Sequence, residues 1–159
     1  QLRQLLLARD GVPIAPLAEL LLMFAGRAQH LAERIRPALA RGESVVCDRF
    51  TDATFAYQGG GRGLPTADIA AAARLVHGDL APDLTLLLDA PPALGLGRVL
   101  ERGAADRFEA EQVEFFTRVR DAYLELAARE PARFVVIDAS QPLETVHASI
   151  RAALAARLP

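Results

Sequence analysis

The segment LTLLL, residues 84–88, is a short apolar run that is followed at once by Asp89. Two other segments have the same form, SVVC at 44–47 and FVVI at 134–137, and an aspartate follows each of them too. Continuous apolar runs of this length, separated by helical patterns, are typical of parallel strands covered on both faces. The sequence therefore predicts an α/β fold with the three aspartates at the carboxyl edge of the sheet, where such folds bind ligands.

Helical periodicity is clearest between residues 17 and 39, where apolar side chains recur at spacings of three and four. Met23 and Arg27 lie beside this apolar stripe, so the arginine is placed to face inward. Further helices are predicted at about 66–77, 92–101, 110–129 and 142–157.

Composition limits the class of protein. A chain of 159 residues suits one domain, here 1–159, and a net charge of -2 argues against a nucleic-acid-binding surface. The sequence has no apolar run long enough to span a membrane, and its first residues, QLRQLLLARD, lack the charged-apolar-small order of a signal peptide. Its single cysteine, Cys47, has no partner within the chain for a disulfide. These features favour a cytoplasmic protein. All eighteen basic residues are arginine, so an anion site would use arginine, backbone amides or metal.

The segment CDRFTDATFAYQGGGRG, residues 47–63, combines an acid–base pair with polar and glycine residues. Thr51 or Asp52 is expected to cap a short helix that runs through Gln58 and places Thr54, Tyr57 and Gln58 on one face. A hydroxyl, a phenol and an amide on one face are suited to reading a nucleobase edge and bounding its sugar. Phe55 would point the other way, into the core.

The glycine triplet at 59–61 is expected to end this helix and to let backbone amides approach an anion closely. Arg62, which follows directly, strengthens the expectation of an anion.

Four segments in this order and spacing resemble the bacterial thymidylate kinase family. They are LLLMFAGRAQH at 20–30, DRF at 48–50, AYQGGGRG at 56–63 and RGAADRFE at 102–109. The resemblance implies a P-loop-kinase-like parallel sheet sandwiched by helices. It also implies transfer of the γ-phosphate of ATP to dTMP, giving dTDP and ADP for dTTP synthesis, with Mg2+ as cofactor. It further implies a cytoplasmic homodimer that pairs through helices including the one at 17–39.

The resemblance assigns roles to residues of the acceptor site. Arg49 resembles the catalytic arginine that holds the acceptor phosphate, and Asp48 its acidic partner near the phosphoryl path and Mg2+. Arg27 resembles the arginine that reaches the thymine carbonyl. Thr54 matches the position facing the base edge, with Gln58 beside it, and Tyr57 matches the ring packed under the deoxyribose.

A second set of roles falls at about 98–109, which resembles a small mobile lid. Arg98, Arg102 and Arg107 are candidates for gripping the ATP phosphates, the last two also as catalytic groups. Asp106, Phe108 and Glu109 would close the lid over the acceptor. Phosphoryl transfer needs positive charge around the transferred group and exclusion of water, and a lid carrying arginine supplies both.

The sequence departs from the family pattern in two places. The residue four before the helix arginine is Met23, where many relatives have the phenylalanine that stacks on thymine, and the neighbouring Phe24 falls in the core stripe. Either side chain remains a candidate for the stack. The phosphate-binding loop GxxxxGK[ST] is absent, and we expect it, with two further strands to make five, in an amino-terminal portion upstream of Gln1.

Two alternatives remain open. The chain could be a nucleoside monophosphate kinase with another acceptor, although Arg27, Thr54 and Tyr57 argue against this. It could also be a truncated or degenerate relative that binds a deoxynucleotide without catalysis. His30, His77 and His147 have no evident ligand partners and are expected at the surface or at helix ends, while Cys47 is expected in a buried strand.

Overall fold

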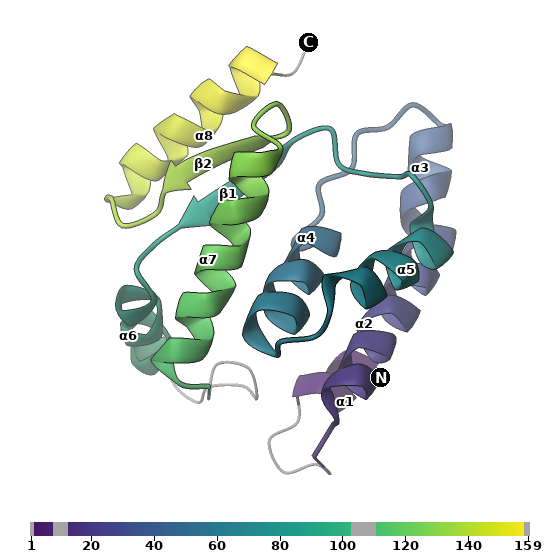
Figure 1. Cartoon of the computed structure of the whole chain (residues 1–159). Helices are drawn as coiled ribbons and strands as arrows, with labels where there is room; N and C mark the ends of the chain where they lie inside the picture. Colours follow the sequence, from purple (N-terminus) through teal and green to yellow (C-terminus); the bar gives the residue numbers. More distant parts are fainter. Residues whose placement is uncertain (1, 8–12, 103–110, 158–159) are drawn as a thin grey trace.

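The computed structural model describes residues 2–7, 13–102 and 111–157 (Figure 1). Its sheet has two parallel strands, β1 (Thr85–Asp89) and β2 (Phe134–Asp138). The register pairs Thr85 with Phe134 and Asp89 with Asp138, so the two aspartates lie side by side at the carboxyl edge. Two of the three predicted strands are therefore confirmed.

The strand predicted at 44–47 is wrong for the described residues. Residues 43–47 have neither helical nor strand structure, and the Val46 side chain is 100% exposed. A strand needs a neighbour for its backbone N–H and C=O groups, and in the described part of the chain β1 pairs only with β2. An apolar run therefore did not by itself produce a strand, and the sheet shows two strands where three were expected.

The predicted helices at 17–39, 66–77, 92–101, 110–129 and 142–157 are confirmed, with small shifts at their ends. The helices in chain order are α1 (Leu2–Leu7), α2 (Pro16–His30), η1 (Leu31–Ile35), α3 (Arg36–Ala40), α4 (Thr51–Thr54), η2 (Phe55–Gly61), α5 (Thr66–His77), α6 (Pro92–Arg102), α7 (Val113–Arg129) and α8 (Leu143–Arg157). The elements η1 and η2 are π-helical segments. None of the described helices is long and apolar enough to cross a bilayer.

The long amino-terminal helix is continuous from α2 through η1 to α3, and its π-helical turn lies just before Pro37. The Arg36 amide donates to the Leu31 carbonyl, five residues back, in place of the usual four. A proline ring clashes with the carbonyl four residues earlier in a regular α-helix, and a wider turn relieves that clash. Pro37 thus loosens the helix without ending it.

Helix α7 is the central element of the fold. It contacts both strands and also lies against η2, while α2 and α5 contact η2 and each other (Figure 1). One hydrophobic cluster joins Leu20 and Phe24 of α2 to Ile69 and Ala73 of α5. Another joins Ala56 of η2 to Phe115 and Val119 of α7. The segment 51–61 is therefore held between two hydrophobic clusters, with its elements fixed from both sides.

Candidate functional site

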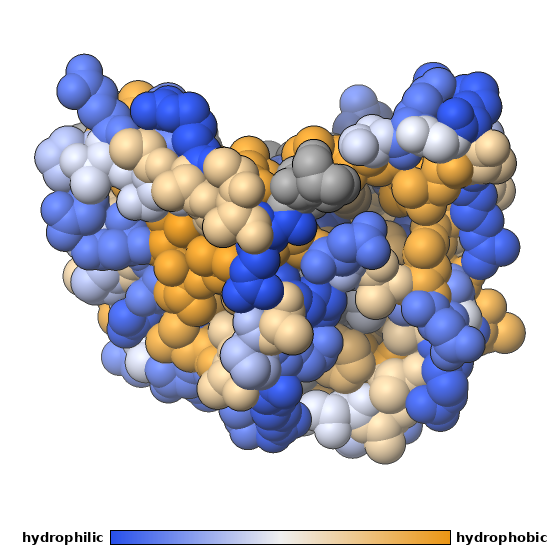
Figure 2. All heavy atoms as spheres, turned by 90° about the horizontal axis from the view of Figure 1, so that it is seen from above, coloured by the Kyte–Doolittle hydropathy of each residue, from blue (hydrophilic) through white to orange (hydrophobic). Residues whose placement is uncertain are grey.

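Three of the residues assigned to the acceptor site, Met23, Arg27 and Arg49, line a hollow of about 170 Å³ between α2 and the segment that leads into α4. Its lining residues are Met23, Gly26, Arg27, His30, Cys47, Arg49 and Phe50. Viewed from above, the molecule is hollowed between two raised sides (Figure 2). Two separate stretches predicted from sequence, 20–30 and 48–50, thus line the same hollow.

Arg27 is the most constrained charged group of this hollow. One guanidinium nitrogen, Nη2, donates to Thr54 Oγ1 at 2.9 Å and to the Phe50 carbonyl at 3.2 Å. The guanidinium carbon lies 4.8 Å from the centre of the Phe24 ring and 5.4 Å from that of Phe50. The other nitrogen, Nη1, is buried and has no hydrogen-bond partner among the described residues. A buried N–H donor without an acceptor is costly, so Nη1 is suited to a ligand oxygen.

Burial is the main influence on the charge of Arg27. It lowers the pKa of the guanidinium, while Cys47 and Asp52 act in the opposite direction. An arginine keeps its charge at physiological pH despite such a shift. The hollow therefore presents a fixed positive charge in a partly desolvated position, where an acceptor oxygen interacts strongly with it.

Met23 and Phe24 occupy different environments. Phe24 is 3% exposed and belongs to the cluster with Leu20, Ile69 and Ala73, whereas Met23 is only partly buried and lines the hollow. The core position predicted for Phe24 is confirmed. Of the two candidates for a base stack, Met23 is the one that the structure places at the hollow.

Arg49 has an unusual backbone. Its φ of 63° lies in the left-handed region, and it is the only described residue other than glycine with a positive φ. Such a conformation costs about 1 kcal/mol for a residue with a side chain and is found mainly at functional positions. The turn directs the guanidinium over the Tyr57 ring, 5.0 Å from its centre. Asp48, the preceding residue, is exposed.

Tyr57 lies among aromatic rings that also fix its position. Its ring centre is 6.1 Å from that of Phe115 and 6.5 Å from that of Tyr123, both in edge-to-face geometry. Burial is the main cause that raises the pKa of Tyr123, and the neighbouring Tyr57 raises it further. Tyr57 of η2 thus contacts the Arg49 guanidinium and two aromatic rings of α7.

The prediction that Thr51 or Asp52 caps the helix beginning at residue 51 is wrong. Phe50 is the N-cap residue and no side chain caps the helix. The Asp52 carboxylate instead accepts two hydrogen bonds from Arg133, at 2.7 and 2.9 Å, and Thr85 Oγ1 donates to it at 3.3 Å. This paired carboxylate joins the acceptor segment to the amino-terminal ends of both strands.

The glycine triplet at 59–61 forms the last residues of η2, which ends at Gly61, so the prediction that the triplet ends this helix is confirmed. A Cβ atom on Gly60 would lie 2.8 Å from the Arg118 carbonyl oxygen and 2.7 Å from Ala122 Cβ. On Gly61 it would lie 2.5 Å from the Phe115 ring. Gly60 and Gly61 are therefore required for the close approach of η2 to α7.

Gln58 does not lie on an open face. Its side chain is 1% exposed, and its amide nitrogen donates to Glu19 Oε1 at 2.8 Å. The structure thus corrects the expectation that this amide reads a base edge beside Thr54. Thr54 itself is 2% exposed and accepts from Arg27, so it acts on the hollow through that arginine.

Glu19 and its partners were missed in the sequence. Glu19 is fully buried, and Arg62 contacts its two carboxylate oxygens at 3.4 Å and Glu111 at 2.5 Å. The expectation that Arg62 meets an external anion is therefore wrong, because protein carboxylates hold it. Glu19 lies four residues before Met23, so extending the spacing of Met23 and Arg27 back by one turn would have found it.

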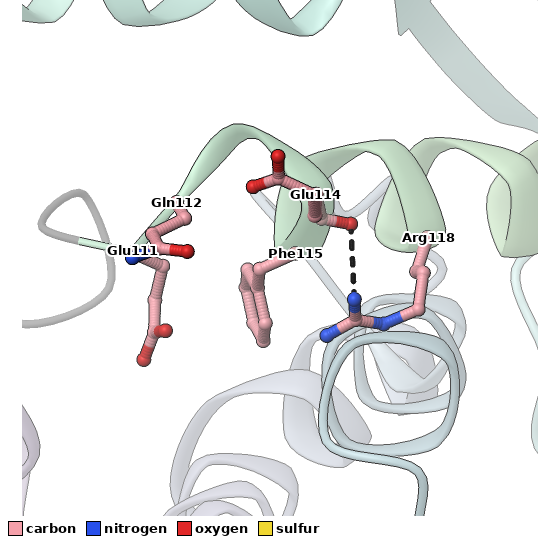
Figure 3. A pocket seen from close by; sticks show the side chains of 5 residues that line it. All are labelled: Glu111, Gln112, Glu114, Phe115 and Arg118. Atoms are coloured by element: carbon pink, nitrogen blue, oxygen red, sulfur yellow. Dashed lines mark hydrogen bonds between the residues drawn. The ribbon is translucent and has the colours of Figure 1, made fainter.

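A second hollow, of about 330 Å³, lies at the start of α7. Figure 3 shows its lining, Glu111, Gln112, Glu114, Phe115 and Arg118. Arg118 donates to the carbonyl oxygens of Glu114, at 3.3 Å, and Gly61, at 3.0 Å. These bonds connect the first turn of α7 to the end of η2.

The residues assigned to the lid are described only in part. Arg98 is exposed on α6 and donates to the Ala139 carbonyl at 3.1 Å, which brings it to the loop after β2. Arg102 is the last residue of α6, but its side chain lies outside what the structure describes. Arg107, Asp106, Phe108 and Glu109 also lie outside the described residues.

The comparisons with known proteins all point to the same family. The model for thymidylate kinase matches residues 1–150. Thymidylate kinases of Chromohalobacter salexigens and Pseudomonas putida are 62% and 58% identical to the chain, over 99% and 97% of its length and 75% and 74% of theirs. The crystal structure of thymidylate kinase from Ehrlichia chaffeensis aligns with a TM-score of 0.68 at 30% identity, over 91% of this chain and 67% of that one. The chain belongs to the thymidylate kinase family.

Proposed function

We propose that the protein transfers the γ-phosphate of ATP to dTMP, giving dTDP and ADP, as a step toward dTTP. Membership of the thymidylate kinase family and relatives of that name at 58% and 62% identity support this reaction. The observation that carries the acceptor assignment is the buried Nη1 of Arg27, an unpaired donor in a hollow lined by Met23 and Arg49. A thymine carbonyl would supply the oxygen that this nitrogen needs.

Arg49 is proposed as the clamp for the acceptor phosphate. Its guanidinium lies above Tyr57, and a forked donor holds a phosphate in two charge-assisted hydrogen bonds. The Tyr57 ring would then lie beneath the deoxyribose. Its contacts with Phe115 and Tyr123 hold the ring rigidly enough to disfavour an added 2'-hydroxyl.

On the donor side we propose roles for three arginines between residues 98 and 107. Arg98, Arg102 and Arg107 are proposed to neutralise charge on the ATP phosphates, and residues 98–109 to form a lid that excludes water. In this role Asp106, Phe108 and Glu109 would contact the acceptor side.

Asp48 suits the proposed Mg2+ ion. No group of three or more His, Cys, Asp or Glu residues that could hold a metal occurs in the described ranges, but Mg2+ in kinases needs only one or two carboxylates together with phosphate oxygens. The exposed carboxylate of Asp48, next to Arg49, meets that requirement. When bound, the ion would neutralise charge on the transferred phosphoryl group.

We also propose that the protein is a cytoplasmic homodimer that pairs through helices including α2. Leu17 and Leu21 of this helix are 55% and 57% exposed, more than half of each side chain. Burying the remaining exposed part of such leucines against a partner contributes about 1 kcal/mol each. Sedimentation at micromolar concentration should give twice the monomer mass, and a monomer alone would contradict this proposal.

The proposed reaction is tested by comparing acceptors. Binding of dTMP, dUMP, dGMP and AMP is measured by calorimetry, and turnover of each with ATP and Mg2+ is followed by ADP release. We expect dTMP to bind and react best. A preference for either purine nucleotide would identify another nucleoside monophosphate kinase, and binding of dTMP without any ADP release would indicate a binding protein.

Replacing Tyr57 with alanine is expected to raise the turnover of TMP relative to dTMP by roughly tenfold, since the wall against the 2'-hydroxyl is removed. The measurement is the ratio of kcat/KM for the two substrates. Tyr57→Phe is the matched control, because it keeps the ring and its contacts with Phe115 and Tyr123. An unchanged ratio in Tyr57→Ala would show that another group excludes the ribose.

A further inference from the structure

His77, the last residue of α5, contacts the segment that carries the acceptor site. Its Nε2 lies 2.8 Å from Thr51 Oγ1. Its ring centre is 5.2 Å from that of Phe50, with the two planes tilted by 44°. One side chain of α5 therefore holds two consecutive residues that lie directly after the strained Arg49.

The same two residues are connected to Arg27. The Phe50 carbonyl accepts from Arg27 Nη2, and the Phe50 ring lies below the guanidinium. His77 thus contacts a segment that directly follows Arg49 and accepts a hydrogen bond from Arg27. A left-handed residue such as Arg49 persists only where neighbouring structure holds it, and the contacts of His77 on its carboxyl side supply such support.

We propose that His77 is a positioning residue for the acceptor site, which orients Arg27 and Arg49 toward the nucleotide through Phe50 and Thr51. This inference rests on the proposed function and assigns to it a residue of α5 that does not line the hollow. His77 acts through other side chains and is not a catalytic residue.

The surroundings of the two ring nitrogens bear on the protonation state that His77 needs for this role. His77 Nδ1 is buried and has no partner among the described residues. With Nε2 facing Thr51 Oγ1, the neutral ring that carries its proton on Nε2 can donate to that hydroxyl. In that form Nδ1 is an acceptor.

The surroundings of the ring oppose a second proton. Burial lowers the pKa of His77 most, followed by Arg27 of α2; hydrogen bonds with the backbone of Gly78 and Leu80 offset part of this, and Arg36 of α3 adds a smaller lowering. A histidine whose pKa falls on folding contributes its stabilisation fully above its unfolded value of 6.5 and loses it as the pH drops through the lowered pKa. The free energy of unfolding should therefore fall as the pH drops below 6.5, in part through His77.

The test measures dTMP binding by calorimetry in the wild-type protein and in His77→Phe. This variant keeps the contact with Phe50 but removes the hydrogen bond to Thr51. We expect the Kd for dTMP to rise about tenfold, a value typical of a lost hydrogen bond of about 1.4 kcal/mol. The KM for dTMP should rise likewise, while kcat changes less than about threefold. His147→Phe, on the exposed face of α8, is the matched control and should bind as the wild type does.

Three further measurements separate positioning from a general loss of structure. His77→Gln, which keeps a side-chain donor, should restore most of the affinity. Thr51→Val should weaken binding as much as His77→Phe, and the double variant should be no worse than either single change.

An unchanged Kd in both His77→Phe and Thr51→Val, with normal thermal unfolding, would overturn the proposal. Additive effects in the double variant would do so as well. If His77→Phe does not fold, Thr51→Val and His77→Gln test the same bond. Failure of the wild-type protein to bind dTMP would count against the proposed function instead, so the two outcomes are distinguishable.

Discussion

Replacing Arg49 with alanine is expected to lower kcat/KM for dTMP by roughly 30- to 1,000-fold. The physical reason is the loss of a charge-assisted clamp on the acceptor phosphate, worth about 2–4 kcal/mol. The left-handed backbone of Arg49 supports a functional role, since the strain has no evident benefit for folding. Steady-state turnover of dTMP, together with its Kd by calorimetry, measures the effect.

The backbone strain offers a sharp control for this experiment. Glycine adopts a φ of 63° without cost, so Arg49→Gly should unfold at the same or a higher temperature than Arg49→Ala, while losing as much transfer. Arg74, an exposed arginine of α5, provides the matched charge control, and Arg74→Ala should react normally. Near-normal turnover in both Arg49 variants would show that another group binds the phosphate.

Replacing Gly60 with alanine is expected to lower the free energy of unfolding by roughly 2–3 kcal/mol. The new methyl group would lie 2.8 Å from the Arg118 carbonyl oxygen, and a backbone atom within a helix cannot rotate aside as a side chain can. The helices η2 and α7 would have to separate, which disturbs the cluster of Ala56, Phe115 and Val119 between them. Thermal unfolding should show the change as a drop in Tm of about 4–12 °C.

Gly95 provides the control for Gly60. It lies in α6, and a Cβ atom there would meet nothing within 4 Å, so Gly95→Ala should leave stability unchanged or raise it by up to about 1 kcal/mol. A Gly60→Ala variant that unfolds like the wild type but no longer transfers phosphate would contradict the packing role. That result would favour instead the anion approach expected from the sequence.

Much of the fold was predictable because periodicity reports which residues are buried. The helix α5, Thr66–His77, matches its predicted range, and the strands β1 and β2 follow the apolar runs within one residue. The run at 44–47 has the same apolar pattern but no neighbouring strand among the described residues, so it is not a strand. Strand formation depends on a partner that local sequence does not reveal.

The candidate site was predictable in part. Arg27, Met23 and Arg49 were named from sequence and line one hollow. Gln58 was placed on the open face by helical spacing, but spacing alone does not show that Glu19, thirty-nine residues earlier, accepts from its amide. Arg62 was assigned an external anion for a similar reason, since its actual carboxylate partners come from α2 and from the residues before α7.

The sequence by itself determined the family of this protein, its α/β class and the side chains available for binding a nucleotide, because motifs and periodicity are local properties of a chain. Only the tertiary structure decided which of those side chains face the hollow and which are held by other residues. It turned the glycines toward α7, buried Gln58 against Glu19, and placed His77 behind Phe50 and Thr51. These outcomes depend on contacts between distant segments, where burial and charge pairing select the partners that local spacing leaves open.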